Sequence, residues 1–211
     1  MKNLFFLSVL LVFLSSAFYG TASAQATEMD KVNHVIHISI DGLRGDLLES
    51  LISKDPSNYS NFRRFVTEGA TTFNARTDYI ETSTLPNHTT MLTARPVSQP
   101  AGAPNTAHHG YVDNEDPKRR TTLHNNGNEN LAYIPSVFDV AHDAGLSTAL
   151  YGSKGKFVLY DQSYSAKHGA ADTTGPDNGT DKIDRYVNEG EGKETVERFL
   201  KEMKAEQYEF A

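Results

Sequence analysis

A hydroxyl group and a carboxylate are the side chains of this sequence best suited to chemistry. Thr84 opens the motif Thr84-Leu85-Pro86-Asn87-His88, and Asp41 lies 43 residues earlier, just before Gly42. A threonine hydroxyl is a weak nucleophile until a neighbouring group or a metal ion activates it, and a carboxylate is a common metal ligand. The pair predicts phosphoryl transfer, but with metal ions that two residues cannot hold. Read singly, Thr84 could instead be a helix N-cap and Asp41 a turn residue.

Asp41 and Thr84 both lie next to an end of a predicted strand or helix. Residues 34–40 form a β-branched run, typical of a central strand in a mostly parallel sheet. Ligand groups in such sheets gather beyond the carboxyl ends of the strands, where Asp41 falls. We expect a helix over residues 86–94, with proline in the first turn. Its free N–H groups would then face a phosphate oxygen held at Thr84.

Helices and strands alternate along the rest of the sequence, which predicts an α/β fold. The hydrophobic periods indicate further helices at 46–52, 59–67, 136–144 and 191–206, and strands at 70–75, 146–151 and from 208 onward. Residues 96–107 are expected to form a surface loop, and residues 108–130 and 161–188 are expected to be irregular.

The first 24 residues are predicted to be a secretory signal peptide, followed by one domain over residues 25–211. Lys2 precedes an apolar run over residues 4–18, and Ala22-Ser23-Ala24 supplies small residues for cleavage before Gln25. The run is short for a membrane span, which needs about 20 apolar residues. We therefore expect an exported protein, periplasmic or extracellular, with no stable membrane span after cleavage.

Charge and cysteine usage narrow the classes of partner and metal site. The formal net charge of −7 is spread along the chain, which argues against a nucleic-acid-binding surface or a polybasic membrane surface. There is no cysteine, so a metal site must use carboxylate, imidazole and hydroxyl groups. The sequence gives no indication of the oligomeric state.

Three motifs in order resemble the nucleotide pyrophosphatase/phosphodiesterase branch of the alkaline phosphatase superfamily. They are Ile38-Ser39-Ile40-Asp41-Gly42-Leu43-Arg44, Thr84-Leu85-Pro86-Asn87-His88-Thr89 and His109-Gly110-Tyr111-Val112-Asp113-Asn114. The resemblance covers about residues 35–160 and implies a three-layer sandwich with a mostly parallel central sheet. It also implies two divalent metal ions, expected to be zinc, with Asp41 as a ligand and Thr84 as both ligand and nucleophile.

The same resemblance implies that the Asn114 amide holds a non-bridging phosphate oxygen. Asn114 follows Thr84 by 30 residues, a longer spacing than is usual in the family, and it could instead be a turn residue. His88 is expected to pack and form hydrogen bonds, and His109 to form a structural corner, with a metal-ligand role as the alternative for each. His37 is expected to be a core histidine. Lys154 and Lys156 could face an anionic substrate or be solvated loop residues.

The family completes its metal sites with an Asp-x-x-x-His element, an Asp-His pair and a distant histidine. No segment of this chain matches them, and Asp139-Val140-Ala141-His142-Asp143 has the wrong spacing. We therefore expect the chain to be the N-terminal part of a longer domain, inactive alone, with the remaining ligands downstream of residue 211.

The function predicted from the sequence is metal-dependent hydrolysis of a small phosphorylated substrate, either a phosphodiester or a nucleotide pyrophosphate. A phosphomonoesterase or phosphonate hydrolase of the same superfamily is the close alternative, because the motifs do not select the leaving group. A truncated, non-catalytic chain is the alternative from another class. The sequence argues against a sulfatase, because the sulfatase nucleophile motif has Cys or Ser followed by x-Pro-x-Arg and this chain contains no Cys.

Overall fold

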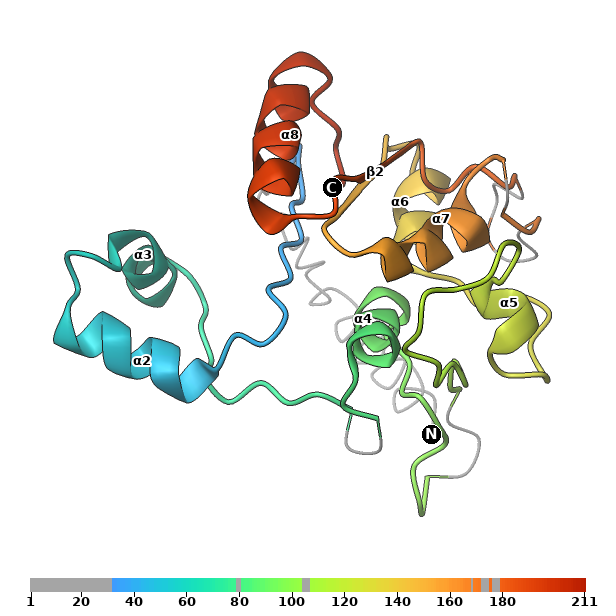
Figure 1. Cartoon of the computed structure of the whole chain (residues 1–211), viewed down its shortest axis with the longest axis horizontal. Helices are drawn as coiled ribbons and strands as arrows, with labels where there is room; N and C mark the ends of the chain where they lie inside the picture. Colours follow the sequence, from blue (N-terminus) through green and yellow to red (C-terminus); the bar gives the residue numbers. More distant parts are fainter. Residues whose placement is uncertain (1–31, 79–80, 104–106, 168, 172–174, 176–178) are drawn as a thin grey trace, which may run out of the picture. The chain divides into compact units, whose positions relative to one another are not determined.

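The structure is a computed structural model that describes residues 32–78, 81–103, 107–167, 169–171, 175 and 179–211. The predicted signal peptide and the predicted mature start at Gln25 lie outside these residues. The chain divides into two units, Met1–Asn33 and His34–Ala211. The elements of the second unit are α2 Gly45–Lys54, α3 Ser60–Glu68, α4 Thr84–Thr93, α5 Leu123–Asn126, α6 Val137–Asp143, β1 Ala149–Gly152, η1 Gly155–Phe157, α7 Val158–Tyr164, β2 Arg185–Asn188 and α8 Gly192–Ala205 (Figure 1).

All the strand pairing in the described residues is parallel. Strands β1 and β2 pair with Ala149 opposite Arg185. Phe210 bridges in parallel to Thr148 on one side and to Val35 on the other. The order across the sheet is therefore residues 35–37, residues 209–211, β1 and β2. This confirms the prediction of an α/β fold, and it confirms that the chain becomes extended again after residue 208.

The prediction that residues 34–40 form a buried central strand is wrong, because within the described chain the segment pairs only over residues 35–37 and all of its residues are exposed. The N–H of Val35 donates to the carbonyl of Glu209 at 2.7 Å, and that of His37 to Ala211 at 2.8 Å. Beyond this point the segment has no strand beside it among the described residues. Ile38 is 71% exposed, and His37 is also exposed rather than in the core.

A hydrophobic core of buried side chains lies among α4, α5, α6 and α7. Leu85 in α4 is fully buried, and so is Thr89 one turn later. The hydroxyl of Tyr160 in α7 lies 3.2 Å from the Thr89 hydroxyl and donates to the Leu85 carbonyl at 3.3 Å. Other members of the cluster are Leu92, Tyr111, Leu123, Tyr133, Ile134, Phe138, Leu159, Tyr164 and Ile183. The packing fixes the position of the α4 helix and therefore of its first residue.

Several predicted element bounds need correction. Residues 70–75 are not a strand, and the Thr71 hydroxyl instead donates to the Phe65 carbonyl at the end of α3. Residues 161–188 were expected to be irregular, yet α7 reaches into this range and β2 lies wholly within it. The buried face of α7 comes from Leu159, Tyr160 and Tyr164, and the polar residues between them obscured the apolar period.

The N-cap of α6 was predicted from the sequence, whereas α4 begins two residues earlier than predicted. Helix α6 follows Ser136, whose hydroxyl accepts from Phe138 N–H while Asp139 closes the capping box, as expected for an N-cap serine. Helix α4 begins at Thr84 rather than Pro86, with Ser83 at the N-cap. Thr84 is therefore the first residue of the helix rather than its cap.

Helix α3 shows that an apolar period does not ensure burial. It lies against α2 (Figure 1), but none of its side chains is buried, and Phe65 is 66% exposed.

No helix in the described part of the chain combines the length and the apolar character of a membrane span.

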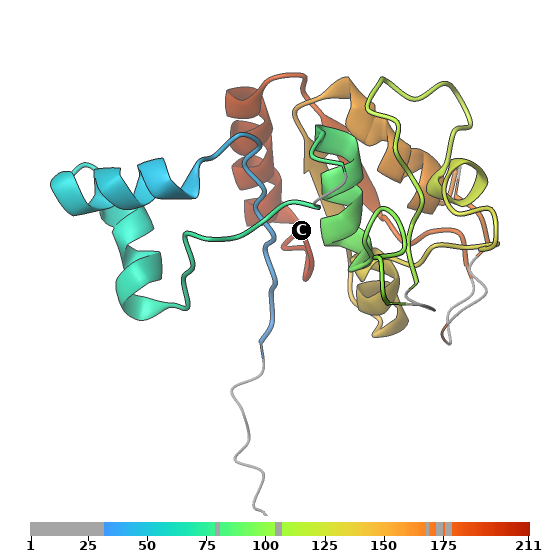
Figure 2. The same ribbon diagram turned by 90° about the horizontal axis from the view of Figure 1, so that it is seen from below.

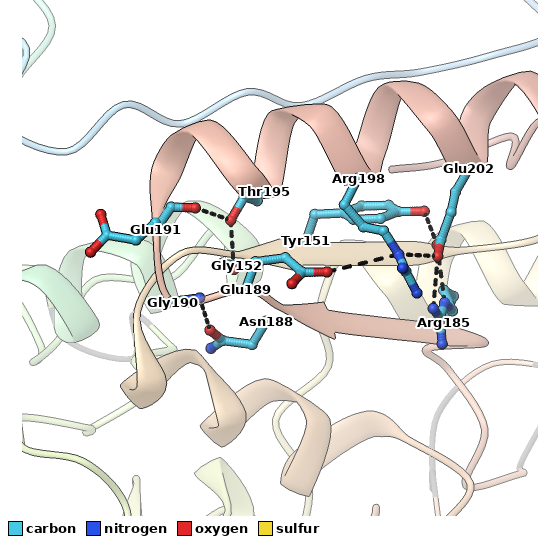
Figure 3. A network of polar contacts seen from close by, with 10 residues as sticks. All are labelled: Tyr151, Gly152, Arg185, Asn188, Glu189, Gly190, Glu191, Thr195, Arg198 and Glu202. Atoms are coloured by element: carbon cyan, nitrogen blue, oxygen red, sulfur yellow. Dashed lines mark hydrogen bonds and ion pairs between the residues drawn. The ribbon is translucent and has the colours of Figure 1, made fainter.

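Helix α8 is attached to the sheet through the carboxylate of Glu202 (Figure 3). Glu202 accepts hydrogen bonds from the guanidinium of Arg185 in β2 at 2.8 Å and from the Tyr151 hydroxyl in β1 at 2.8 Å. Arg198 adds a third donor from the same helix. These donors, Arg185 first, lower the pKa of Glu202 to about 2, so the carboxylate is charged at neutral pH.

His109 and Gly110 form the corner predicted from the sequence, and the corner is held by a neutral imidazole. His109 is fully buried, and Gly110 has a φ of 71°, which favours glycine. The N–H of Tyr111 donates to His109 Nδ1 at 3.0 Å, so Nδ1 carries no proton. Nε2 lies 3.1 Å from the Thr90 hydroxyl in α4, to which it can donate. Burial lowers the pKa of His109 to about 4.

The pKa of His109 predicts a loss of stability in mild acid. Because the folded value lies below the usual 6.5, the native state binds fewer protons than the unfolded chain between about pH 6.5 and pH 4. The free energy of unfolding should fall through this window by up to about 3 kcal/mol, since one pKa unit corresponds to about 1.4 kcal/mol. Urea unfolding at pH 7 and pH 4.5 measures it. In His109→Gln, which cannot titrate, the difference should shrink; an unchanged difference would contradict the assignment.

Candidate active site

Thr84 and Asp41, predicted to act together, do lie together. The Thr84 hydroxyl donates a hydrogen bond to Asp41 Oδ2 at 3.1 Å. Helix α4 supplies Thr84 at its first position, and Asp41 follows the extended segment that pairs with residues 209–211. Gly42 has a φ of 75° and turns the chain away directly after the carboxylate. The hydroxyl hydrogen points to Asp41, so the oxygen lone pairs remain available on its other side.

Asn114 joins the same site through the start of α4. The N–H of Leu85 donates to Asn114 Oδ1 at 3.0 Å. Because a backbone N–H can donate only to the amide oxygen, the other atom of the Asn114 amide is the Nδ2 donor. No hydrogen bond among the described residues uses this Nδ2, so it can donate to a ligand oxygen. The long spacing after Thr84 therefore still brings Asn114 to the nucleophile.

Two lysines complete the polar cluster, and the sequence alone had left their role open. Lys154 Nζ donates to Asp41 Oδ2, the oxygen that also accepts from Thr84. Lys156 Nζ donates to the backbone carbonyl of Asn114. Both lysines follow the carboxyl end of β1, and the Asn188 amide at the end of β2 donates to the Lys154 carbonyl at 2.6 Å. The sequence signal was a pair of lysines just after a predicted strand.

Both ring nitrogens of His88 contact protein groups beside the candidate nucleophile. One ring nitrogen lies 2.8 Å from the Thr84 carbonyl oxygen and the other 3.0 Å from the Ser39 hydroxyl. The ring also packs on Phe157, with centroids 4.9 Å apart. Burial lowers the pKa of His88, which favours the neutral ring. These contacts agree with the packing and hydrogen-bonding role expected from the sequence.

The charge state of Asp41 limits what it can do chemically. The hydrogen bond from Lys154 is the main cause that lowers the pKa of Asp41, and the Thr84 hydroxyl adds to it. Asp41 is therefore a carboxylate at neutral pH and a weak base. Its position suits it to orient the Thr84 hydroxyl, and the neighbouring Lys154 places positive charge where a phosphate would bring negative charge.

The described residues do not assemble a complete metal site. Asp41 and Thr84 supply one carboxylate and one hydroxyl, but no group of three or more His, Cys, Asp or Glu residues that could hold a metal ion occurs in the described part of the chain. Four-coordinate zinc sites use at least three protein ligands. Asp139, whose motif only imitates a ligand element, is buried and accepts from the Ser136 backbone and hydroxyl. The metal site predicted from the sequence, with Asp41 and Thr84 as ligands, therefore stays a prediction.

The fold and the site define an α/β protein whose polar groups gather beyond the carboxyl ends of parallel strands, the usual place for a ligand in such sheets. The family model described as type I phosphodiesterase / nucleotide pyrophosphatase matches residues 35–209. The chain belongs to this family, a family of hydrolases, which is consistent with the alkaline phosphatase superfamily. Comparisons with curated proteins and with solved structures gave no match.

Removal of the Lys154 charge should leave the fold intact. The side chains of Lys154 and Asp41 are 41% and 42% exposed, and such solvated pairs contribute less than about 1 kcal/mol. Lys154→Met should therefore change the free energy of unfolding by no more than that, measured by urea denaturation. Lys193→Met on the outer face of α8 is the matched control. A loss of several kcal/mol would mean that Lys154 is a structural residue.

Proposed function

We propose that this family member hydrolyses phosphate esters, phosphodiesters or nucleotide pyrophosphates, with Thr84 as the nucleophile. The observation that carries the proposal is the hydrogen bond from the Thr84 hydroxyl to Asp41, formed beside Asn114 and Lys154. A threonine that merely began a helix would not require a carboxylate, a side-chain amide and an ammonium group around it. Membership of a phosphodiesterase family supports the same chemistry.

In the proposed reaction the Thr84 oxygen forms a bond to phosphorus while the bond from phosphorus to the leaving oxygen breaks. Asp41, a weak base, orients the Thr84 hydroxyl through its hydrogen bond. The hydroxyl proton passes to solvent, and the leaving oxygen is protonated from solvent. Water then attacks the phosphothreonine, which restores the hydroxyl and releases phosphate or a phosphate monoester. Asn114 Nδ2 donates to a non-bridging oxygen, and Lys154 balances negative charge on the phosphoryl group.

We also propose that the reaction requires two divalent metal ions, expected to be zinc. Such ions would supply positive charge at the attacking and leaving oxygens. The proposal rests on the family, with Asp41 and Thr84 as two of the ligands. We assign the other ligands to polypeptide that follows this chain, within a complete domain that is a three-layer sandwich. Residues 25–211 would be the N-terminal part of that domain and inactive alone.

Removal of the Thr84 hydroxyl should abolish turnover without unfolding the protein. In the full-length gene product, Thr84→Ala should lower kcat by about 10³-fold or more, whereas Thr84→Ser keeps a hydroxyl and should retain part of the rate. Hydrolysis of a chromogenic diester measures the rates. Peptide mass spectrometry of the trapped phosphothreonine intermediate shows which residue carries the phosphate. Thr93→Ala, at the other end of α4, tests helix damage. Normal turnover by Thr84→Ala would refute the proposed nucleophile.

A phosphomonoesterase or phosphonate hydrolase remains a second candidate because of the two lysines. Lys154 and Lys156 both contact the cluster that holds Thr84, and two ammonium groups suit a terminal phosphate with two negative charges. Rates on a chromogenic monoester and a diester with the same leaving group distinguish the candidates. A preference for the monoester that is lost in Lys156→Met would favour the second.

The proposed location is outside the cytoplasm, either periplasmic or extracellular, after removal of residues 1–24. The support is the charged start, the apolar run and the small residues before Gln25. We expect the exported protein to begin at Gln25, as N-terminal mass spectrometry would show. Ala24→Leu should impair cleavage because the site requires a small residue, and Thr27→Leu, beyond the cleavage site, is the control. A mature protein that retains residue 1 would contradict the signal assignment.

A further inference from the structure

The backbone of Lys154 is held by a residue of the neighbouring strand. The Asn188 side chain, at the end of β2, donates from Nδ2 to the Lys154 carbonyl at 2.6 Å. Asn188 lies opposite Gly152 in the register of β1 and β2, and Lys154 is the second residue after Gly152. The Asn188 amide therefore adds one more hydrogen bond between the two strands, beyond the end of β1.

The orientation of the Asn188 amide follows from its other hydrogen bond. Its Oδ1 accepts from the N–H of Gly190 at 3.0 Å (Figure 3). Because a backbone N–H can only donate, the oxygen faces Gly190 and the nitrogen faces the Lys154 carbonyl. The turn after β2 uses only the oxygen. The hydrogen bond from Nδ2 to a residue 34 positions earlier is therefore not explained by the turn.

The same loop is also held where it leaves β1. The carbonyl of Gly152 accepts from the Thr195 hydroxyl of α8 at 3.1 Å (Figure 3) and from the Glu189 N–H at 3.3 Å. Helix α8, drawn in red in Figure 2, lies against β1. Carbonyl groups at Gly152 and Lys154 are both bound, so the backbone that carries the lysine side chain is fixed relative to β2 and α8.

The Lys154 ammonium group depends on this fixed backbone. Its Nζ donates to Asp41 Oδ2, the oxygen that also accepts from the Thr84 hydroxyl. The Lys154 side chain is 41% exposed, so packing alone does not fix the ammonium group. A lysine also loses much side-chain conformational entropy when it is held in one place. A shift of the Lys154 backbone would therefore move the ammonium group away from Asp41 and Thr84.

We propose that Asn188 is a positioning residue for phosphate binding and acts through Lys154. The inference rests on the proposed function, in which Lys154 balances negative charge on a phosphoryl group. Asn188 holds the Lys154 backbone where the ammonium group can reach a phosphate oxygen beside Thr84. Its own amide contacts protein groups on both sides, so it acts without touching the phosphate. Asn188 belongs to none of the three sequence motifs.

A double-mutant cycle between Asn188 and Lys154 tests this coupling. The probe is inorganic phosphate, titrated by calorimetry into the full-length gene product. Asn188→Ser keeps an oxygen for the Gly190 N–H, but its side chain is too short to reach the Lys154 carbonyl. It should weaken phosphate binding by about fivefold when Lys154 is present and by less than about twofold in Lys154→Met, because the two residues act as one unit.

The matched control is Asn125→Ser in α5, a helix that contributes no residue to the candidate site. Like Asn188, Asn125 accepts a backbone N–H at Oδ1, from Thr122 at 2.8 Å, and donates from Nδ2 to a carbonyl, that of Arg120 at 2.9 Å. Its substitution removes a similar set of hydrogen bonds and should leave phosphate binding unchanged. Urea unfolding of every variant shows whether the fold is retained.

The substitution Asn188→Thr repeats the cycle with a β-branched residue that suits a strand. Equal weakening by the Asn188 substitutions with and without the Lys154 ammonium group would overturn the proposal, because a merely structural residue would act in both backgrounds. Unchanged phosphate binding in both variants, loss of the fold in both, or no phosphate binding by the unsubstituted protein would also overturn it.

The calorimetric titration separates this inference from the proposed nucleophile. Phosphate binding needs no turnover, so the coupling between Asn188 and Lys154 can be measured whether or not Thr84 attacks phosphorus. Normal turnover by Thr84→Ala together with a coupled cycle would refute the nucleophile and support the role of Asn188. Loss of turnover in Thr84→Ala together with an uncoupled cycle would support the nucleophile and refute the role of Asn188.

Discussion

The burial of Leu85 is the constraint on which the candidate site depends. A nucleophilic hydroxyl has to be held in place, yet Thr84 itself is only partly buried. The next residue in α4 is fully buried in the core, and its carbonyl accepts from the buried Tyr160 hydroxyl. Its N–H is held by Asn114. The packing of one leucine therefore fixes the position of Thr84 and of the amide that faces it.

The remaining groups reach Thr84 because the extended segments are parallel. Asp41 and Lys154 follow two different extended segments and Asn188 ends a third, and all three residues lie at the carboxyl ends of these segments. Parallel strands bring such residues together without requiring them to be near in sequence. Lys154 is 113 residues from Asp41, yet the two side chains share a hydrogen bond. The parallel sheet thus brings residues that are distant in the sequence into one cluster.

More of the candidate site than of the fold could be predicted from the sequence. The motifs identified Asp41, Thr84 and Asn114 because their residue types and order carry the chemistry, and the structure brings the three together. The lysines could not be assigned, because an exposed lysine after a strand is common and only the register of β1 directs Lys154 to Asp41. Helix α7 was missed since polar residues separate its tyrosines, and the exposure of Ile38 depends on which strands lie beside it.

Solvent exposure limits the electrostatic effect of the charges around Thr84. Asp41 and Lys154 are about two-fifths exposed, so water screens their attraction and would screen their action on a bound phosphate. Coulomb energies rise several-fold when the effective dielectric constant falls from that of water towards that of a protein surface. The charges around Thr84 would therefore act more strongly on a bound phosphate if water were excluded from the site.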